Sequence, residues 1–154
     1  MTIRPGGGAD VKAVMRLEGV AVGAPRWAEA DYLAAVELQE GAVRRCLLVA
    51  ETEGRLVGFA VGKVAKVGDE TLAELESVAV DPGERRRGVG QALCRAVLAW
   101  GREMGAERME LEVRAGSVAI GLYAGLGFAE TGRRRGYYRD PAADAVLMQI
   151  DLGR

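Results

Sequence analysis

The segment that most constrains the fold of this chain is an apolar strand that runs through a tight loop into a helix opened by glycine. It reads Val78-Ala-Val-Asp-Pro-Gly-Glu-Arg85-Arg-Arg-Gly88-Val-Gly90. The N-terminus of a helix leaves backbone N–H groups unpaired and carries partial positive charge. Glycines let a ligand approach that backbone closely, and the arginines add full charges. The segment favours binding of a phosphate or pyrophosphate, although a loop that only packs a helix against a strand has the same pattern.

Two common nucleotide-binding motifs do not fit this turn. A Walker-type phosphate loop needs Gly-Lys-Ser/Thr, and Gln91 stands where the lysine would be. A dinucleotide-binding fingerprint needs a third glycine, and Leu93 occupies that position. The strand also lies in a hairpin region in mid-chain instead of opening a βαβ unit. The turn therefore belongs to neither of these two motifs.

The spacing of apolar residues predicts a mixed α/β fold. A stripe from Val89 to Met104 recurs at helical spacing and is closed by Gly105, whereas residues 108–113 alternate, with Glu110 and Glu112 on the polar side. Asp10 is expected to cap the first helix, and Ser117 a short later one. We expect strands at 2–4, 46–50, 56–66, 72–80, 108–113, 128–133 and 146–152, and helices from 10, over 28–39, over 88–105 and over 117–126. The order is βααβββαβαββ, with several hairpins, which differs from a doubly wound sheet.

Composition limits the classes of function. The 154 residues predict one domain spanning 1–154, because a chain of this length can bury a sufficient core. Hydrophobic residues make up 49% and charged residues 28%, and no apolar run reaches the length of a membrane span. The net charge of −1 gives no reason to expect nucleic acid or a membrane as partner. With two cysteines far apart and no signal peptide, we expect a reduced, cytoplasmic protein.

The chain contains no histidine. This excludes Ser-His and Cys-His nucleophiles, HExxH zinc sites, zinc fingers and histidine proton relays. Acid–base chemistry must therefore use Glu, Asp, Tyr, Lys or Cys, and we expect no metal.

The glycine turn resembles the acetyl-CoA motif of the GNAT superfamily of N-acetyltransferases, whose signature is Arg/Gln-x-x-Gly-x-Gly/Ala. The order of elements matches that fold along nearly the whole chain. Four segments also resemble the bacterial ribosomal-protein alanine N-acetyltransferases: Pro25-Arg-Trp27, Leu111-Glu-Val-Arg114, Leu122-Tyr-Ala-Gly-Leu-Gly-Phe128 and Arg134-Arg-Gly-Tyr-Tyr138. The resemblance implies a mostly antiparallel central sheet flanked by helices, with acetyl-CoA as co-substrate.

The resemblance also implies how acetyl-CoA is held. Backbone groups of Val78, Ala79 and Val80 would pair with the pantetheine arm like an added strand. Ser117 stands near the position of an asparagine that contacts the cofactor in the family, in a loop one residue shorter. The pyrophosphate would lie at the turn, whose members are Arg85, Arg86, Arg87, Gly88, Val89, Gly90 and Gln91.

By the same resemblance, Glu112 is the general base and Tyr123 the general acid. Glu112 faces away from an apolar side and can project into a cleft, but a solvated strand residue has the same pattern. Glu76, just before the cofactor-binding strand segment, is the rival base. Tyr123 lies on an otherwise apolar helix, so a core tyrosine is the alternative.

The most favoured acceptor is a protein N-terminal α-amine, such as that of a ribosomal protein. An α-amine has a pKa near 8, and a lysine, with a pKa near 10.4, costs roughly 3 kcal/mol more to deprotonate. Tyr137, Tyr138 and Trp27, together with Glu76, are candidate acceptor contacts, with strand aromatics and a hydrophobic staple as the structural alternatives. A small amine, amino acid or lysine acceptor is one alternative function. A non-catalytic acyl-CoA-binding sensor is another.

Overall fold

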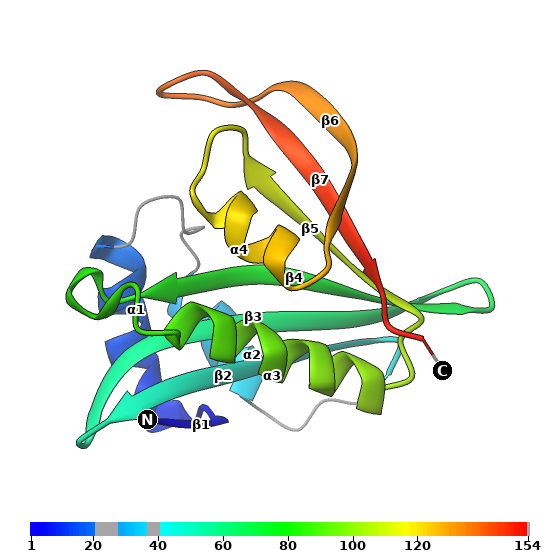
Figure 1. The fold of residues 1–154 in the computed structure, drawn as a ribbon. Coiled ribbons are helices and arrows are strands. Elements are labelled where there is room, and N and C mark those ends of the chain that lie inside the picture. The colour runs from blue at the N-terminus through cyan, green and yellow to red at the C-terminus, as the bar shows by residue number, and fades with distance from the viewer. Residues whose placement is uncertain (21–27, 37–40, 154) are drawn as a thin grey trace.

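A twisted seven-stranded sheet with the strand order β1-β2-β3-β4-β5-β7-β6 forms the centre of the computed structural model, which describes residues 1–20, 28–36 and 41–153 (Figure 1). The strands are β1 (Thr2–Pro5), β2 (Val43–Thr52), β3 (Arg55–Val67), β4 (Glu70–Val80), β5 (Arg108–Arg114), β6 (Ala129–Tyr138) and β7 (Ala143–Asp151). The helices are α1 (Val11–Val20), α2 (Glu29–Val36), α3 (Val89–Glu103) and α4 (Ala119–Gly125), with 3-10 turns η1 (Gly8–Asp10) and η2 (Pro82–Glu84). The mixed, mostly antiparallel α/β fold and its predicted order of elements are confirmed.

The sheet has two cores, one on each face. The apolar stripe of α3 packs on one face, where Leu93 and Val97 are fully buried. This helix lies close to β3 because the strand has glycine beneath it: a Cβ added at Gly62 would lie 2.8 Å from the side chain of Val97. On the other face, α1 and α2 cover a second core around Tyr32 and Phe59. The predicted strand and helix periodicities therefore correspond to real buried faces.

The junction between β4 and β5 is the parallel step in the sheet, and it is short. Only Leu72 to Glu74 pair with Arg108 to Glu110; beyond these pairs the two strands part. Figure 1 shows β4 and β5 diverging toward the C-terminal end of β4. Within the described chain, the edge of β4 from Glu76 to Val80 consequently pairs with β3 alone. The backbone pairing of the sheet is therefore interrupted between β4 and β5 beyond Glu74 and Glu110, and we call this interruption the opening.

A β-bulge in β4 lies at the start of this opening. Leu75 pairs with Gly62 and Ser77 pairs with Val61, so Glu76 is the extra residue. A bulge changes which face the following side chains take. Leu75 accordingly packs in the core beneath α3, whereas Ala79 packs in the core beneath α1.

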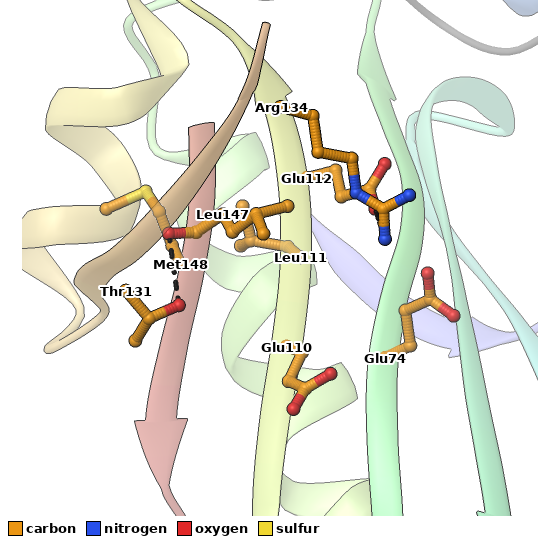
Figure 2. Close-up of a pocket in the computed structure, with 8 residues that line it drawn as sticks. All are labelled: Glu74, Glu110, Leu111, Glu112, Thr131, Arg134, Leu147 and Met148. Atoms are coloured by element: carbon orange, nitrogen blue, oxygen red, sulfur yellow. Dashed lines mark hydrogen bonds and ion pairs between the residues drawn. The ribbon is translucent and has the colours of Figure 1, made fainter. Parts of the chain in front are cut away.

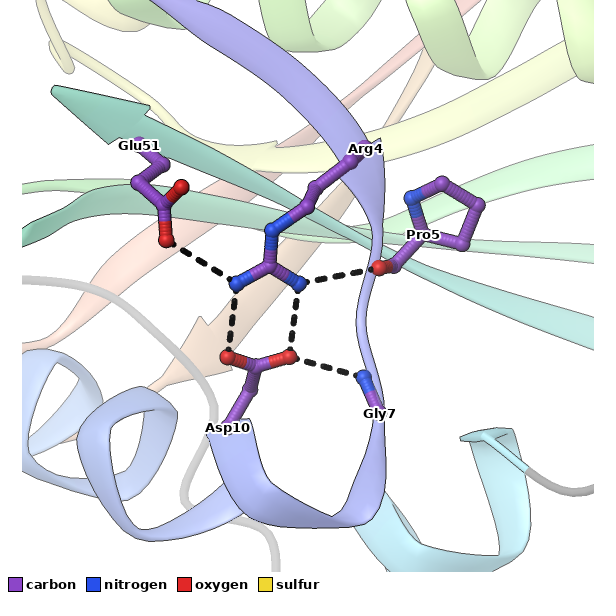
Figure 3. A network of polar contacts seen from close by, with 5 residues as sticks. All are labelled: Arg4, Pro5, Gly7, Asp10 and Glu51. Carbon is purple, nitrogen blue, oxygen red and sulfur yellow. Dashed lines mark hydrogen bonds and ion pairs between the residues drawn. The ribbon is translucent and has the colours of Figure 1, made fainter. Parts of the chain in front are cut away.

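The start of the chain is held by a polar network around Arg4 (Figure 3). Its guanidinium donates to both oxygens of Asp10, at 2.8 and 2.9 Å, and to Glu51 of β2 at 3.1 Å. Asp10 also accepts the N–H of Gly7 at 2.8 Å. The prediction that Asp10 caps the first helix is therefore wrong in detail: its carboxylate lies in η1 and braces the preceding turn against β1 and β2.

Replacing Asp10 with asparagine is expected to lower Tm at pH 7 by about 2–4 °C. The hydrogen bonds from Arg4 are the main cause that holds the pKa of Asp10 below its usual range. A carboxyl group with a lowered folded-state pKa stabilises the protein above its unfolded pKa, near 3.9, and loses that contribution as pH falls through the folded value. Thermal melts at several pH values should therefore show a difference between the two proteins that shrinks in acid. An equal difference at pH 7 and pH 2.5 would contradict this account.

Candidate active site

A pocket with a volume of about 150 Å³ lies at the short junction between β4 and β5 and extends over β7 and β6 (Figure 2). Residues of β4, β5, β6 and β7 line it: Glu74, Glu110, Leu111, Glu112, Thr131, Arg134, Leu147 and Met148. Three of these residues are glutamates and one is an arginine. The pocket therefore combines proton-accepting carboxylates with one cation.

Glu112 projects into this pocket from β5. Its neighbours Leu111 and Val113 are buried in the core beneath α3, so Glu112 faces the opposite side of the sheet, as the alternation predicts. The carboxylate is 29% exposed and lies 3.3 Å from the guanidinium of Arg134 on β6. In Figure 2 the Arg134 side chain reaches across β5 toward this carboxylate. Glu112 is thus reachable from solvent and, among the described residues, forms its ion pair with Arg134.

Glu74 faces Glu110 across the short parallel junction, beside Glu112. Burial is the main cause that raises the pKa of Glu74, and the charges of Glu76, Glu112 and Glu110 raise it further, whereas Lys63 lowers it. The pocket is therefore a negative environment, which favours a positively charged amine over an anion.

Glu76, the rival base, has a different environment. It lies on the bulge, where Nε of Arg45 donates to one carboxylate oxygen at 2.7 Å and a terminal nitrogen donates to the other at 3.3 Å. It does not line the pocket of Glu112. Both of its oxygens are engaged by one guanidinium, so Glu76 is a poorer candidate for accepting a proton from a substrate.

Tyr123 lies on α4 in the core beneath α3 and packs edge-on against Phe128, with ring centres 6.0 Å apart. Burial raises the pKa of its hydroxyl well above the ordinary value, with smaller contributions from Cys94 and Tyr138. The pKa of Tyr138 is also raised, by burial and then by the charge of Glu112. Both hydroxyls are therefore protonated at neutral pH. Tyr138 is an electrostatic neighbour of Tyr123 and of Glu112.

The aromatic pair of β6 is presented beside Glu112. The rings of Tyr137 and Tyr138 lie 5.2 Å apart and nearly perpendicular. Arg134 lies over Tyr137 at 5.6 Å, and Arg114 lies over Tyr138 at 4.7 Å. The strand predicted at 128–133 is longer in the structure, and both tyrosines belong to it. Trp27 lies outside the described residues.

Ser117 lies one residue before the N-cap of α4, which is Val118, so the prediction that Ser117 caps this helix is wrong in detail. Its Oγ accepts the N–H of Ala119, the first residue of α4, at 3.2 Å. Ser117 therefore contacts the start of the helix that carries Tyr123.

The glycine turn has a backbone suited to an anion. Arg86 and Gly88 both have positive φ, +66° and +79°, and α3 begins at Val89. The N–H of Ala92 bonds to the carbonyl of Gly88, which leaves the amides of residues 89–91 without acceptors inside the helix. Glu84 braces the turn through Arg55 at 2.7 Å and Arg87 at 3.6 Å. Alternating backbone amides of this kind form an anion-binding concavity.

The β4 edge leads from the pocket to this turn. Ala79 and Val80 pair with Phe59 and Gly58 of β3 on one side only. The buried hydroxyl of Ser77 has no hydrogen-bond partner among the described residues. A long ligand with amide groups and a diphosphate, such as acetyl-CoA, would find amide partners on the strand edge and an anion site at the turn.

Sequence reasoning missed two parts of this site, the bulge at Glu76 and the contact between Arg134 and Glu112. Arg134 stands in a run of arginines, and only the pairing of β5 and β6 with β7 shows which of them lies near Glu112. Within the described ranges, Asp, Glu and Cys side chains form no group of three or more that could hold a metal ion. None of the helices in the described ranges is long and apolar enough to cross a membrane.

Residues 14–128 match the family model described as the acetyltransferase (GNAT) family. The chain is 39% identical over 102 residues to the [ribosomal protein bS18]-alanine N-acetyltransferase of Escherichia coli, with 64% of this chain and 66% of that protein covered. It is 37% identical over 107 residues to the N-alpha-acetyltransferase RimI of Mycobacterium tuberculosis, with 68% and 65% covered. The match therefore spans just under two thirds of the length of these relatives.

Solved structures extend the similarity to nearly the whole chain. The crystal structure of the ribosomal-protein alanine N-acetyltransferase of Escherichia coli is 31% identical, with a TM-score of 0.78 and 99% and 94% of the two chains covered. Ard1 of Thermoplasma volcanium is also 31% identical, with a TM-score of 0.77 and 97% and 96% covered. A protein of Salmonella typhimurium solved with acetyl-CoA shares the fold at 22% identity, with a TM-score of 0.78 and 100% and 95% covered.

Proposed function

This chain belongs to the acetyltransferase (GNAT) family, whose enzymes use acetyl-CoA, and on that premise we propose that it acetylates protein N-terminal α-amines. The acceptor type proposed is the N-terminal alanine of a ribosomal protein, the type named for its relatives. The observation that carries the proposal is the arrangement around the junction of β4 and β5. A carboxylate-lined pocket lies at this junction, and the edge of β4 beyond it leads to a turn suited to an anion. With such an acceptor, the proposed location of the reaction is the cytoplasm.

The donor side of the proposal rests on backbone groups. The edge at Val78–Val80 would pair with the pantetheine arm, and the amides of residues 86–91 would hold the diphosphate. Acetyl-CoA supplies the activated acetyl group as a thioester. The residues of this chain supply its orientation and the proton transfers.

On the acceptor side, Glu112 is the proposed base. An α-ammonium group has a pKa near 8, so a carboxylate, directly or through water, is sufficient to accept its proton, whereas a lysine is harder to deprotonate. The open position of Glu112 supports this role over Glu76, whose two oxygens are held by Arg45. The negative pocket also favours approach of an ammonium group.

On the donor side, Tyr123 is the proposed acid that protonates the leaving thiolate. It lies in the core beneath α3, on the opposite face of the sheet from Glu112. The proposed base and acid thus lie on opposite faces of the sheet. The raised pKa of Tyr123 keeps its proton available at neutral pH.

Replacing Tyr123 with phenylalanine is expected to lower kcat by about 10²-fold while leaving the affinity for acetyl-CoA within about twofold, because proton transfer is lost but the ring packing is kept. Steady-state kinetics and calorimetry measure the two quantities. Full activity of this variant would mean that Tyr123 is not the acid and contributes only packing.

The proposed acceptor is tested with acetyl-CoA and a panel of amines, following the release of free thiol. The panel contains peptides with free N-terminal alanine, the same peptides with blocked N-termini and an internal lysine, free amino acids and small amines. Turnover confined to free N-terminal peptides supports the proposal, and mass spectrometry should place the acetyl group on the α-nitrogen. Turnover only on small amines or lysine would refute the acceptor. Binding of CoA without turnover on any amine would make the protein a sensor.

A further inference from the structure

The β6–β7 hairpin contains a bulge that the proposed chemistry leaves unexplained. Arg134 pairs with Ala145 and Tyr138 pairs with Ala143, so the interval on β6 is longer than the interval on β7. Gly136 lies inside the bulge with a φ of +60°. This is a left-handed conformation, in which the backbone does not continue the ladder and needs another partner for its N–H.

Asp144 supplies that partner from the opposite strand. Its Oδ1 accepts the N–H of Gly136 at 2.9 Å. Its own backbone carbonyl accepts the N–H of Ala115, also at 2.9 Å, just beyond the end of β5. One residue of β7 therefore links the bulge to the strand that carries Glu112.

The bulge determines where three neighbouring side chains lie. Arg134, at its start, forms the ion pair with Glu112, and Tyr137 and Tyr138 stand at its end. Arg114 fixes the far side, because it stacks over Tyr138 and donates to the carbonyl of Pro141 at 2.6 Å. The side chain of Asp144 thus forms a hydrogen bond with the bulge itself, whereas Arg114 forms one with the turn beyond it.

We propose that Asp144 is a positioning residue for the acceptor: by holding the Gly136 amide it fixes the bulge that sets Arg134, Tyr137 and Tyr138 around Glu112. The proposal rests on the proposed function, since it assumes that the acceptor amine meets Glu112. Asp144 itself does not line the pocket and acts through the backbone of β6.

The mechanism predicts which property of Asp144 matters. If it acts as a hydrogen-bond acceptor, asparagine can replace it, because an amide oxygen accepts the same N–H. If it acts by its charge, for example on nearby Arg133, asparagine fails as alanine does. The variants D144A and D144N separate these two accounts. D151A, which removes an exposed aspartate at the other end of β7, controls for the loss of a carboxylate from this strand.

Steady-state kinetics with a free N-terminal peptide is the main measurement. D144A is expected to raise the acceptor KM by about fivefold, the effect of losing one hydrogen bond, with the Kd for acetyl-CoA within about twofold of wild type. D144N and D151A should stay near wild type. Equal KM values for D144A and wild type would overturn the proposal. An equal rise of the acceptor KM in D144N would also overturn it. A D144A protein in which the acceptor KM and the Kd for acetyl-CoA rise together would overturn it as well.

Amide hydrogen exchange of Gly136 in the protein without substrates gives an independent readout. The exchange rate should rise in D144A and not in D144N, and an unchanged rate in D144A would show that Asp144 does not hold the bulge. If wild type acetylates only small amines, the proposed acceptor is wrong, and the KM comparison is made with that amine. If wild type acetylates no amine, the proposed function and the proposed role of Asp144 in acceptor binding both fail. The exchange measurement would still show whether Asp144 holds the amide of Gly136.

Discussion

Replacing Glu112 with glutamine is expected to lower kcat by about 10²–10⁴-fold, the usual contribution of a positioned general base. The substitution keeps the shape of the side chain, but it removes the negative charge that pairs with Arg134 together with the capacity to accept a proton. Because Glu112 faces away from the core beneath α3, we expect Tm and the Kd for acetyl-CoA to stay close to wild type. Thiol-release kinetics with a free N-terminal peptide measures the change in kcat.

Glu76→Gln is the variant that discriminates between the two candidate bases. It removes the negative charge that pairs with Arg45, on the bulge outside the pocket. A large loss of kcat in this variant, together with an active Glu112→Gln protein, would transfer the role of base to Glu76. Loss in both would indicate that the opening needs both carboxylates.

The second large effect is expected at the glycine turn. Replacing Gly88 with valine should raise the Kd for acetyl-CoA by about 10- to 100-fold, because a β-branched residue is strained at positive φ and the backbone amides of the turn must then move. A Cβ at Gly88 meets no atom within 4 Å in the described structure, so the cost comes from backbone conformation and not from a clash. Isothermal calorimetry with CoA measures the change.

Gly68→Val is the matched control for that experiment. Gly68 lies in the β3–β4 turn at a φ of +65°, and a Cβ there also meets nothing within 4 Å among the described residues. The backbone strain is therefore similar, but the turn is remote from the proposed diphosphate site. An equal loss of CoA affinity in both variants would mean that general destabilisation, rather than the anion-binding turn, explains the effect.

The fold was largely predictable because both periodicities correspond to packed faces. The stripe of α3 and the alternation of β5 each bury one side, and their positions matched the prediction. The prediction was weakest for β6, which is an edge strand exposed along most of its length. Without a buried face, Arg133 to Tyr138 show no alternation, so the strand was predicted to end at 133.

The site was predictable only where local pattern determines it. The orientation of Glu112 follows from strand alternation, and the contact of Ser117 with the start of α4 follows from its place before an apolar helix. The bulge at Glu76 depends on the register between β3 and β4, and the ion pair of Arg134 depends on β6 lying beyond β7 in the sheet. These are long-range pairings that no window of sequence contains.

The brief parallel junction between β4 and β5 lies between the two halves of the proposed reaction centre. The anion-binding turn lies at the start of α3, and Glu112 faces the other side of the sheet, so acetyl-CoA and the acceptor amine can bind at the same time. Neither has to leave before the other arrives, so initial-rate plots at varied concentrations of both should give intersecting lines, the pattern of a ternary complex, and not the parallel lines of a ping-pong sequence.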